Sequence, residues 1–421
     1  MAQVFPFRGL RYHSRFTGEI DRLTTPPYDV IGEQERESYE KAHPRNIVRL
    51  ILPGEAGRPE DGTFYSGAAA LLDRWRREET LVLDSQPGFY PYRQTYRSPE
   101  GSPASRLGFL GALALPEAGQ SGALPHERTL HAPREDRTRL ILACRANLSP
   151  IFLLHPDDSG EVGSVLGRAA LRAPLVEMTD RRGVRHELWR MDDPEEIGRI
   201  RRGMSSDWTL IADGHHRYES AQAVMRQLPD VEGARSVLAF FCSLKDEGFR
   251  IFPIHRLVRP TGSADTERIG KLLEREFPVL ACSEGAGIEE LMAALKETGP
   301  GSFGVGLKGR PPFVIHIHPL PREADPEAQV ENLDPVLLER EILSRLLGIS
   351  PEAVAGGAVA FTSDAREAFR QVDQGEAAAA FFLRPLDVEV VVRAARAGLR
   401  LPQKSTYFYP KLLTGLVLRP F

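Results

Sequence analysis

Cysteine is scarce in this chain of 421 residues. The three cysteines (Cys144, Cys242 and Cys282) are odd in number, lie far apart and form no Cys-x-x-Cys pair. A disulfide scaffold and a thiolate zinc site are therefore disfavoured, and a reducing compartment is expected. The sequence also lacks a signal-peptide pattern and any apolar run approaching about 18 residues, the length that spans a bilayer. We expect a soluble, cytoplasmic protein that makes no membrane contact.

An excess of positive charge is missing as well. Lysine and arginine number 54 against 58 acidic residues, so the formal net charge is −4 and no basic field favours nucleic acid as a partner. Only 7 of the 54 basic residues are lysine, and two of these, Lys404 and Lys411, lie close together near the C-terminus. Apolar residues at 42% and charged residues at 27% are typical of globular domains.

The order of the apolar patterns predicts a mixed α/β (α+β) fold with two domains. Residues 1–260 are expected to form an N-terminal α/β region, residues 261–392 an α/β insertion or second domain, and residues 393–421 a segment that returns to the core. The short apolar runs Asn46–Leu52 and Leu412–Leu418 are interpreted as strands.

The strongest local pattern is Asp-Gly-His-His-Arg at 213–217. A β-type run, 208–212, precedes it and apolar residues at helical spacing follow it, which predicts a strand–turn–helix. Gly214 allows a ligand to approach the backbone, and the first amides of the helix favour an anion. Arg217 adds a forked guanidinium that matches phosphate or carboxylate. Asp213 is placed to bind Mg²⁺ or to accept a hydroxyl proton.

A purely structural interpretation of the same turn stays open. Asp213 would then be a helix N-cap, the histidines would be solvated, and Arg217 would pair locally with Glu219. A zinc site is disfavoured because His215 and His216 are adjacent, point in different directions on a helix, and are followed by no third ligand at standard spacing.

Three further segments carry candidate ligand contacts. Residues 126–139 hold many donors and form either an anion-binding loop or a solvated loop paired with itself. Residues 402–411 form either a proline-bounded loop whose lysines, hydroxyls and aromatic rings hold a phosphate or a planar ring, or an ordinary strand edge. Residues 26–29 form a rigid turn, for which a structural role is the default. The side chains singled out are His126, Glu127 and Arg137 in the first segment, Lys404, Ser405, Thr406 and Lys411 in the second, and Tyr28 and Asp29 in the third.

Several runs along the chain combine into a family pattern. In order, they are Phe5–Tyr12, Pro26–Ile31, Asn46–Leu50, His126–Glu127, Asp136–Arg137, Ala212–Glu219 and Lys404–Lys411. Together they resemble the prokaryotic family catalogued as "domain of unknown function 1015". The resemblance spans the whole chain, and the set is far more specific than any one motif.

The turn at 213–217 is similar to the phosphate-binding turn of the ParB-like superfamily, a Gly-x-x-Arg that opens a helix. Within that superfamily, free serine kinases carry an Asp-Gly-His-x-Arg version, which Asp213, Gly214, His215 and Arg217 match. Those enzymes phosphorylate the hydroxyl of free L-serine from a nucleotide donor. The resemblance implies a ParB-like core with large insertions, in which Asp29, a loose match to an acidic catalytic residue, would come near Asp213.

These inferences predict a kinase-like phosphotransferase acting on a small hydroxylated metabolite such as free L-serine, with ATP, ADP or pyrophosphate as the donor and Mg²⁺ as a cofactor. The expected catalytic residues are Asp213, His215 and Asp29, and Asp213 is also the expected Mg²⁺ ligand. The expected phosphate- or nucleotide-binding residues are Gly214, His216, Arg217, His126, Glu127, Arg137, Lys404, Ser405, Thr406 and Lys411. Two alternatives stay open: a nucleotide- or phosphate-binding regulatory module without significant catalysis, and a metabolite-binding protein whose arginines hold a carboxylate.

Overall fold

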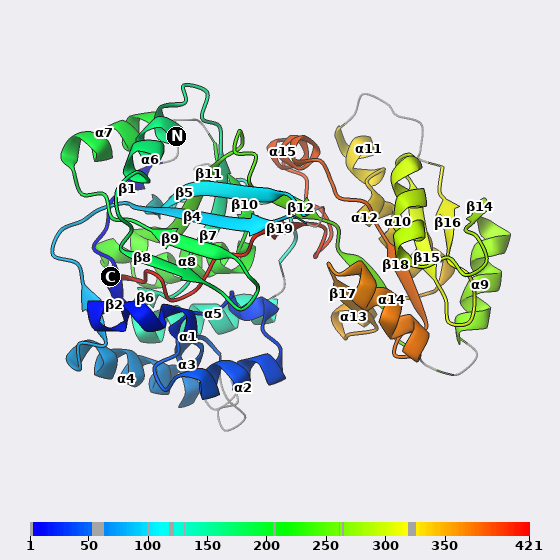
Figure 1. Ribbon diagram of the computed structural model, residues 1–421, viewed down its shortest axis with the longest axis horizontal. Helices are drawn as coiled ribbons and strands as arrows, with labels where there is room; N and C mark the ends of the chain where they lie inside the picture. Colours follow the sequence, from blue (N-terminus) through cyan, green and yellow to red (C-terminus); the bar gives the residue numbers. More distant parts are fainter. Residues whose placement is uncertain are drawn as a thin grey trace. The chain divides into compact units, whose positions relative to one another are not determined.

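The computed structural model describes residues 3–52, 63–98, 101–117, 122–129, 131–204, 208–260, 262, 265–318 and 326–421. The chain divides into two compact units (Figure 1). Unit 1 comprises Met1–Pro125, Thr129–Phe249 and Pro410–Phe421, and unit 2 comprises His126–Arg128 and Arg250–Tyr409.

The division after Phe249 lies upstream of the sequence-based boundary at 260/261. The reason is that β13 (His255–Val258) pairs with two strands of the sheet of unit 2. The segment that returns to unit 1 begins at Pro410 rather than at 393, because α15 (Val388–Arg396) stays with unit 2. The second unit is an α/β unit, as the alternating pattern indicates.

Unit 1 is built around an eight-stranded mixed sheet. Across the sheet its strands are β10 (Leu210–Asp213), β7 (Ile151–His155), β11 (Ser236–Ser243), β5 (Pro103–Ala114), β4 (Tyr90–Arg97), β9 (Arg185–Leu188) and β8 (Val176–Thr179), with β1 (Val4–Phe5) also paired to β5. Strands β7 and β11 run parallel, and the other pairs are antiparallel. Two small antiparallel pairs accompany the sheet, β2 (Leu10–Tyr12) with β3 (Leu81–Leu83) and β6 (Ala146–Asn147) with β20 (Arg419–Pro420).

Helices cover both faces of this sheet. They are α1 (Ile20–Leu23), α2 (Glu33–Ala42), α3 (Val48–Ile51), α4 (Thr63–Arg77), α5 (His131–Cys144), α6 (Glu161–Ala169), α7 (Pro194–Gly203) and α8 (His215–Gln227), with 3-10 helices η1 (Ser14–Glu19), η2 (Tyr28–Val30) and η4 (Glu232–Arg235). Figure 1 shows α6 and α7 on one side of the sheet and α1 to α4 on the other.

The period-2 alternation of the strands divides the sheet of unit 1 into two chemically different faces. On one face, Phe109 and Phe241 stack with ring centroids 5.0 Å apart and pack with Val165 of α6 and Ile200 of α7. Burying each such side chain stabilises the fold by roughly 1.5–3 kcal/mol. The opposite face carries a buried arginine, Arg106, among aromatic rings, and this face supports the candidate site.

Two short apolar runs are not the predicted strands. Within 46–52 the chain forms the helix α3, because the Asn46 side chain accepts a hydrogen bond from the Val48 amide at 2.8 Å and starts a helical turn. Periodicity alone cannot separate a short buried helix from a strand. Residues 412–418 make isolated bridges at Thr414 and Leu418 instead of a continuous ladder, since Gly415 takes a left-handed φ of +101° between them.

Unit 2 contains a six-stranded antiparallel sheet covered by helices on both faces. Its strands, in order, are β14 (Val279–Ala281), β16 (Phe313–His316), β15 (Ser302–Gly306), β18 (Ala379–Phe382), β13 and β17 (Val359–Thr362), and β12 (Arg250–Phe252) pairs separately with β19 (Tyr407–Tyr409). Besides α15, its helices are α9 (Asp265–Glu276), α10 (Ile288–Glu297), α11 (Pro326–Glu331), α12 (Asp334–Leu337), α13 (Pro351–Ala355) and α14 (Ala365–Gln374), with a π-helical stretch, Leu338–Leu346. Phe381 packs toward α9 and the π-helical stretch, and Phe382 toward α10 and α14.

The fold is therefore mixed α/β in both units, as the sequence predicts. A ParB-like core within unit 1 stays a prediction from the resemblance. Every helix in the described ranges is too short or too polar to traverse a lipid bilayer. Two stretches rich in glycine and proline, 53–62 and 116–125, have the composition of surface loops, and the first stretch and part of the second lie outside the described residues.

Candidate functional site

The site is centred on the turn between β10 and α8. Asp213 is the last residue of β10, Gly214 is the N-cap with φ +91°, and His215 begins the helix. A Cβ on Gly214 would lie 3.0 Å from the guanidinium atoms of Arg217, so that side chain folds back over the turn. Glycine is required at position 214 because the backbone there is left-handed and because the Arg217 guanidinium leaves little room for a Cβ. The predicted strand–turn–helix is confirmed.

Two cations hold the carboxylate of Asp213. Lys411 Nζ binds its Oδ1, and an Arg217 nitrogen donates to Oδ2 at 2.5 Å. All three side chains are at most 15% exposed. Burial acts to raise the pKa of Asp213, but the charges of Lys411 and Arg217 outweigh it and hold the pKa well below its usual range. The three groups together carry one net positive charge at the N-terminus of α8.

A pair of polar residues on the sheet face of unit 1 fixes the backbone that carries Lys411. The Gln94 amide donates to the Lys411 carbonyl at 2.9 Å, and Arg106 donates to the Pro410 carbonyl at 2.7 Å and to Gln94 Oε1. These neighbours on β4 and β5 face each other across the ladder. Lys411 thus reaches Asp213 from a segment anchored to the sheet.

Arg106 is fully buried, and aromatic rings surround it. Its guanidinium carbon lies 4.5 Å from the Phe152 ring centroid and 5.2 Å from that of Phe240. Burial lowers its pKa, and its Nε and one terminal nitrogen have no hydrogen-bond partner within the described residues. Neither Arg106 nor Gln94 was predicted from the sequence. The available signal was a single arginine placed where the long apolar strand begins, which alone does not indicate burial.

A small cavity brings three of the sequence motifs together. It has a volume of about 30 Å³, and its lining includes Tyr28, Arg137 and Arg217. The Arg137 guanidinium carbon lies 4.2 Å from the Tyr28 ring centroid, a cation–π contact. Burial, followed by the charge of Asp29, raises the pKa of Tyr28 to about 12. The cavity is the size of a water molecule, so it can accept only a small part of any ligand.

Arg137 lies on α5, where the sequence analysis expected a loop. Its Nε donates to Asp136 at 2.6 Å and its Nη1 to the Ile51 carbonyl at 2.8 Å, while Tyr65 donates to Asp136 at 2.8 Å. From residue 131 onward the predicted anion-binding loop is helical because Leu140, Ile141 and their neighbours form a buried helical face. Arg137 is thereby held rigidly beside Tyr28.

The remaining candidates of unit 1 differ in how deeply they are buried. His215 is buried, and its charge contributes to the lowered pKa of Asp213, while His216 is half-buried. Asp29 is exposed on η2, next to Tyr28. The close approach of Asp29 to Asp213 therefore stays a prediction.

A second group of candidates lies in unit 2. The Glu127 carboxylate accepts from the amides of Ser405 at 3.2 Å and Thr406 at 3.4 Å, and His126 Nε2 lies 2.8 Å from Thr406 Oγ1. Lys404 is exposed with a left-handed φ of +57°, which turns the next amides toward one acceptor. His126, Glu127, Lys404, Ser405 and Thr406 form one cluster, in which the Glu127 carboxylate is the anion that accepts from the backbone amides.

Mg²⁺ does not fit Asp213 in this arrangement. Both carboxylate oxygens are engaged by cations, and no group of three or more His, Cys, Asp or Glu side chains suited to a metal occurs in the described part of the chain. A divalent ion there would have to displace Lys411 or Arg217.

Several solved structures share a low level of similarity with the chain. A free serine kinase variant in complex with AMP is 15% identical, with 70% of this chain and 89% of that chain covered and a TM-score of 0.37. A conserved hypothetical protein from Pyrococcus furiosus is 16% identical, with 70% and 91% covered and a TM-score of 0.37. C-terminally truncated SbnI from Staphylococcus aureus is 12% identical, with 70% and 83% covered and a TM-score of 0.35. Similarity at this level assigns no activity.

No curated protein matches the chain. A family model described as "Protein of unknown function (DUF1015)" matches residues 4–336. That match takes in the Pro-Pro-Tyr-Asp turn, the segment around Glu127 and the turn at Asp213, whereas Lys404–Lys411, the last run of the resemblance, lies beyond the matched residues. The chain belongs to the family of proteins described as DUF1015.

Proposed function

We propose that the chain is a phosphotransferase that acts on the hydroxyl of a small metabolite, with free L-serine as the first candidate. The phosphate donor would be held at the turn 213–217. The observation that carries the proposal is the convergence of Lys411 and Arg217 on Asp213 at the N-terminus of α8. Phosphoryl transfer requires positioning and neutralisation of charge more than covalent chemistry, and this turn has the groups for both.

Each residue has a distinct role in this proposal. Lys411 and Arg217 meet the charge of the transferred phosphoryl group, and Gly214 lets that group approach the backbone. Asp213 keeps the two cations in place and stays ionised. A carboxylate whose pKa is strongly lowered is a weak proton acceptor, so the general base is assigned to His215 or Asp29.

The cluster of unit 2 would bind a second anionic group. His126, Lys404, Ser405 and Thr406 supply donors, and Glu127 already accepts from the backbone amides there. A phosphate group would have to displace the Glu127 carboxylate. The donor would be ATP, ADP or pyrophosphate, and the other partner is the small-molecule acceptor.

One alternative is supported by a specific observation. The Arg217 guanidinium donates to the Pro150 carbonyl as well as to Asp213, so it is committed to contacts within the protein. That arrangement also suits a nucleotide- or phosphate-binding regulatory module without significant catalysis. Binding without turnover would distinguish this module from the kinase.

Phosphorus NMR tests the proposal directly. The protein is incubated with ATP, ADP or pyrophosphate and a panel of hydroxyl compounds that includes L-serine, and a new phosphomonoester resonance is the expected result. Asp213→Asn should abolish transfer while the fold is kept, because one oxygen acceptor for the two cations is lost. Asp158→Asn, at an aspartate 89% exposed, is the matched control, and Lys245→Met, at a lysine 62% exposed, is the control for a change at a lysine.

Three outcomes would contradict a part of this proposal or the whole of it. Normal turnover by Asp213→Asn would refute the role of that carboxylate. Thermal stabilisation by nucleotide without any phosphomonoester would favour the regulatory module. Neither stabilisation nor product with any phosphate donor would favour the protein that binds a carboxylate.

A further inference from the structure

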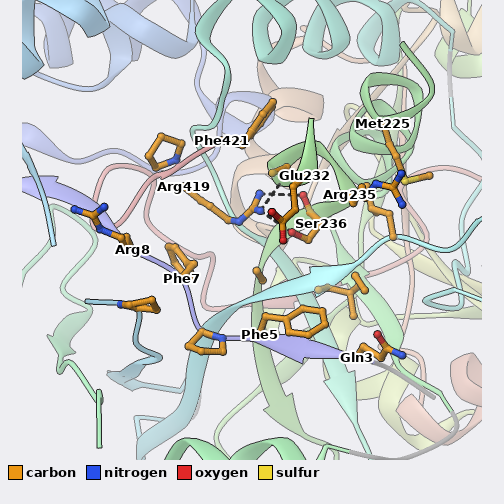
Figure 2. A pocket seen from close by; sticks show the side chains of 18 of the residues that line it. Gln3, Phe5, Phe7, Arg8, Met225, Glu232, Arg235, Ser236, Arg419 and Phe421 are labelled. Atoms are coloured by element: carbon orange, nitrogen blue, oxygen red, sulfur yellow. Dashed lines mark hydrogen bonds between the residues drawn. The ribbon is translucent and has the colours of Figure 1, made fainter. Parts of the chain in front are cut away.

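A large cavity lies in unit 1, lined by residues other than those of the turn at 213–217. Its volume is about 1210 Å³, above the roughly 300–1,000 Å³ of most small-molecule sites. The walls come from β1, the end of β5, the start of β11 and the C-terminal residues of the chain (Figure 2). The space is large enough for a complete metabolite.

Positive charge dominates the lining. It contains five arginines and two glutamates, so the formal charge of these groups is three positive units. The arginines are Arg8, Arg76, Arg201, Arg235 and Arg419, and the acids are Glu117 and Glu232. Within the described part of the chain, only one of the five has a carboxylate within 4.0 Å: Arg235 lies 3.7 Å from Glu117, and both side chains are exposed. Arg8, Arg76, Arg201 and Arg419 thus form no ion pair with any residue that the structure describes.

Arg419 is a buried cation at this cavity. It is 7% exposed, and among the described residues its guanidinium donates to neutral oxygens alone, those of Asn147, Ser236 and the Gly233 carbonyl. Burial lowers its pKa to about 10. Figure 2 shows Arg419 hydrogen-bonded beside Ser236, with Arg8 and Arg235 on different sides of it. A buried charge without a counter-charge is unfavourable, and an anion in the cavity would offset that cost.

Apolar side chains accompany the charges. Phe5 lies in the lining with the Arg201 guanidinium carbon 5.5 Å from its ring centroid, and Phe421 and Met225 line the cavity elsewhere (Figure 2). Aromatic and thioether surfaces of this kind bind flat or apolar groups. The lining therefore combines surplus guanidinium charge with an apolar contact area.

We propose that this cavity binds a small anionic metabolite that has an apolar or planar body. The anionic groups, phosphate or carboxylate, are held by the arginines of the lining, and the apolar body lies on Phe5 and Phe421. This is a second ligand site, independent of the phosphotransferase site at Asp213. Its occupant balances the charge that the protein leaves unpaired there.

Binding of three probes to the full chain tests the site. 8-Anilinonaphthalene-1-sulfonate combines a sulfonate with a planar body, and its fluorescence reports binding. Inorganic pyrophosphate and citrate are then added as competitors, which separates phosphate from carboxylate recognition. The variant Arg76→Gln/Arg201→Gln should weaken the binding of the dye and of the preferred competitor by about tenfold or more, equivalent to 1.4 kcal/mol.

The matched control is Arg275→Gln/Arg366→Gln, which removes the same charge from two exposed positions of unit 2. This control should leave the affinity for the dye and for its competitors unchanged. Thermal melting should show that both double variants fold. The proposal is overturned if no probe binds, or if both double variants bind alike. It is also overturned if Lys411→Met, and not the Arg76/Arg201 change, removes binding, because the anion would then belong to the turn at Asp213.

Discussion

Lys411 Nζ and Asp213 Oδ1 form an ion pair between residues 198 positions apart in the sequence. Asp213 belongs to a strand in the middle of the chain, and Lys411 to the segment that returns to unit 1. The candidate site is therefore complete only when the last segment lies on the sheet. This pairing makes Lys411 the most informative position for substitution.

Lys411→Met should lower the proposed phosphoryl transfer by about 10²-fold or more, because the variant removes a cation that meets the developing charge. Asp213 keeps Arg217 as a partner, so we expect a loss of only about 1–3 kcal/mol in unfolding free energy. Steady-state kinetics and thermal melting measure the two effects. Transfer equal to that of Lys245→Met would contradict the role of Lys411.

Gly214→Ala tests whether the turn depends on the folded-back guanidinium. Alanine at a left-handed position costs about 1–2 kcal/mol, and its Cβ would also lie 3.0 Å from Arg217. Gly160→Ala is the matched control, since Gly160 is also a left-handed N-cap in unit 1, with nothing within 4 Å of a Cβ. Chemical denaturation should show a larger loss for Gly214→Ala. Equal losses would mean that Arg217 moves aside freely.

Arg106 and Gln94 are expected to act as one unit. Arg106→Met leaves the Pro410 carbonyl and Gln94 Oε1 without their donor, a loss of about 1–3 kcal/mol in unfolding free energy. Gln94→Leu removes the contact to the Lys411 carbonyl. In a double-mutant cycle, the double variant should lose less unfolding free energy than the sum of the losses of the two single variants. Strict additivity would show that the two side chains support the 410–411 backbone separately.

Unit 2 should lose stability in weak acid because of His255. Burial, with the charge of Arg256, lowers the pKa of His255 from 6.5 to about 4. Between these values the unfolded chain takes up a proton that the folded unit does not, so unfolding free energy falls as pH drops from 6.5 toward 4, by up to about 1.4 kcal/mol per pH unit. His255→Gln should flatten this dependence in denaturation curves. His131→Gln, at an exposed histidine, should not, and identical pH profiles for wild type and His255→Gln would contradict the assignment.

The local sequence pattern predicted the turn at 213–217, whereas the other parts of the candidate site depend on contacts between residues far apart in the sequence. The strand, the glycine and the helix around Asp213 follow from neighbouring residues, so the sequence sufficed for them. The pairing with Lys411 and the burial of Arg106 depend on strands that meet only in the folded state, which no local spacing indicates. The helix at 48–51 was missed because the short run Val-Arg-Leu-Ile fits a buried strand equally well until the hydrogen bond from the Val48 amide to the Asn46 side chain is seen.

The division of the chain has a consequence for biosynthesis. Because Pro410–Phe421 belongs to unit 1, a ribosome will have translated all of unit 2 before the missing part of the first unit emerges. Until then, part of the interior of unit 1 stays exposed in the nascent chain, while unit 2 can already fold. Truncation of these last residues would thus damage the half of the protein that was made first.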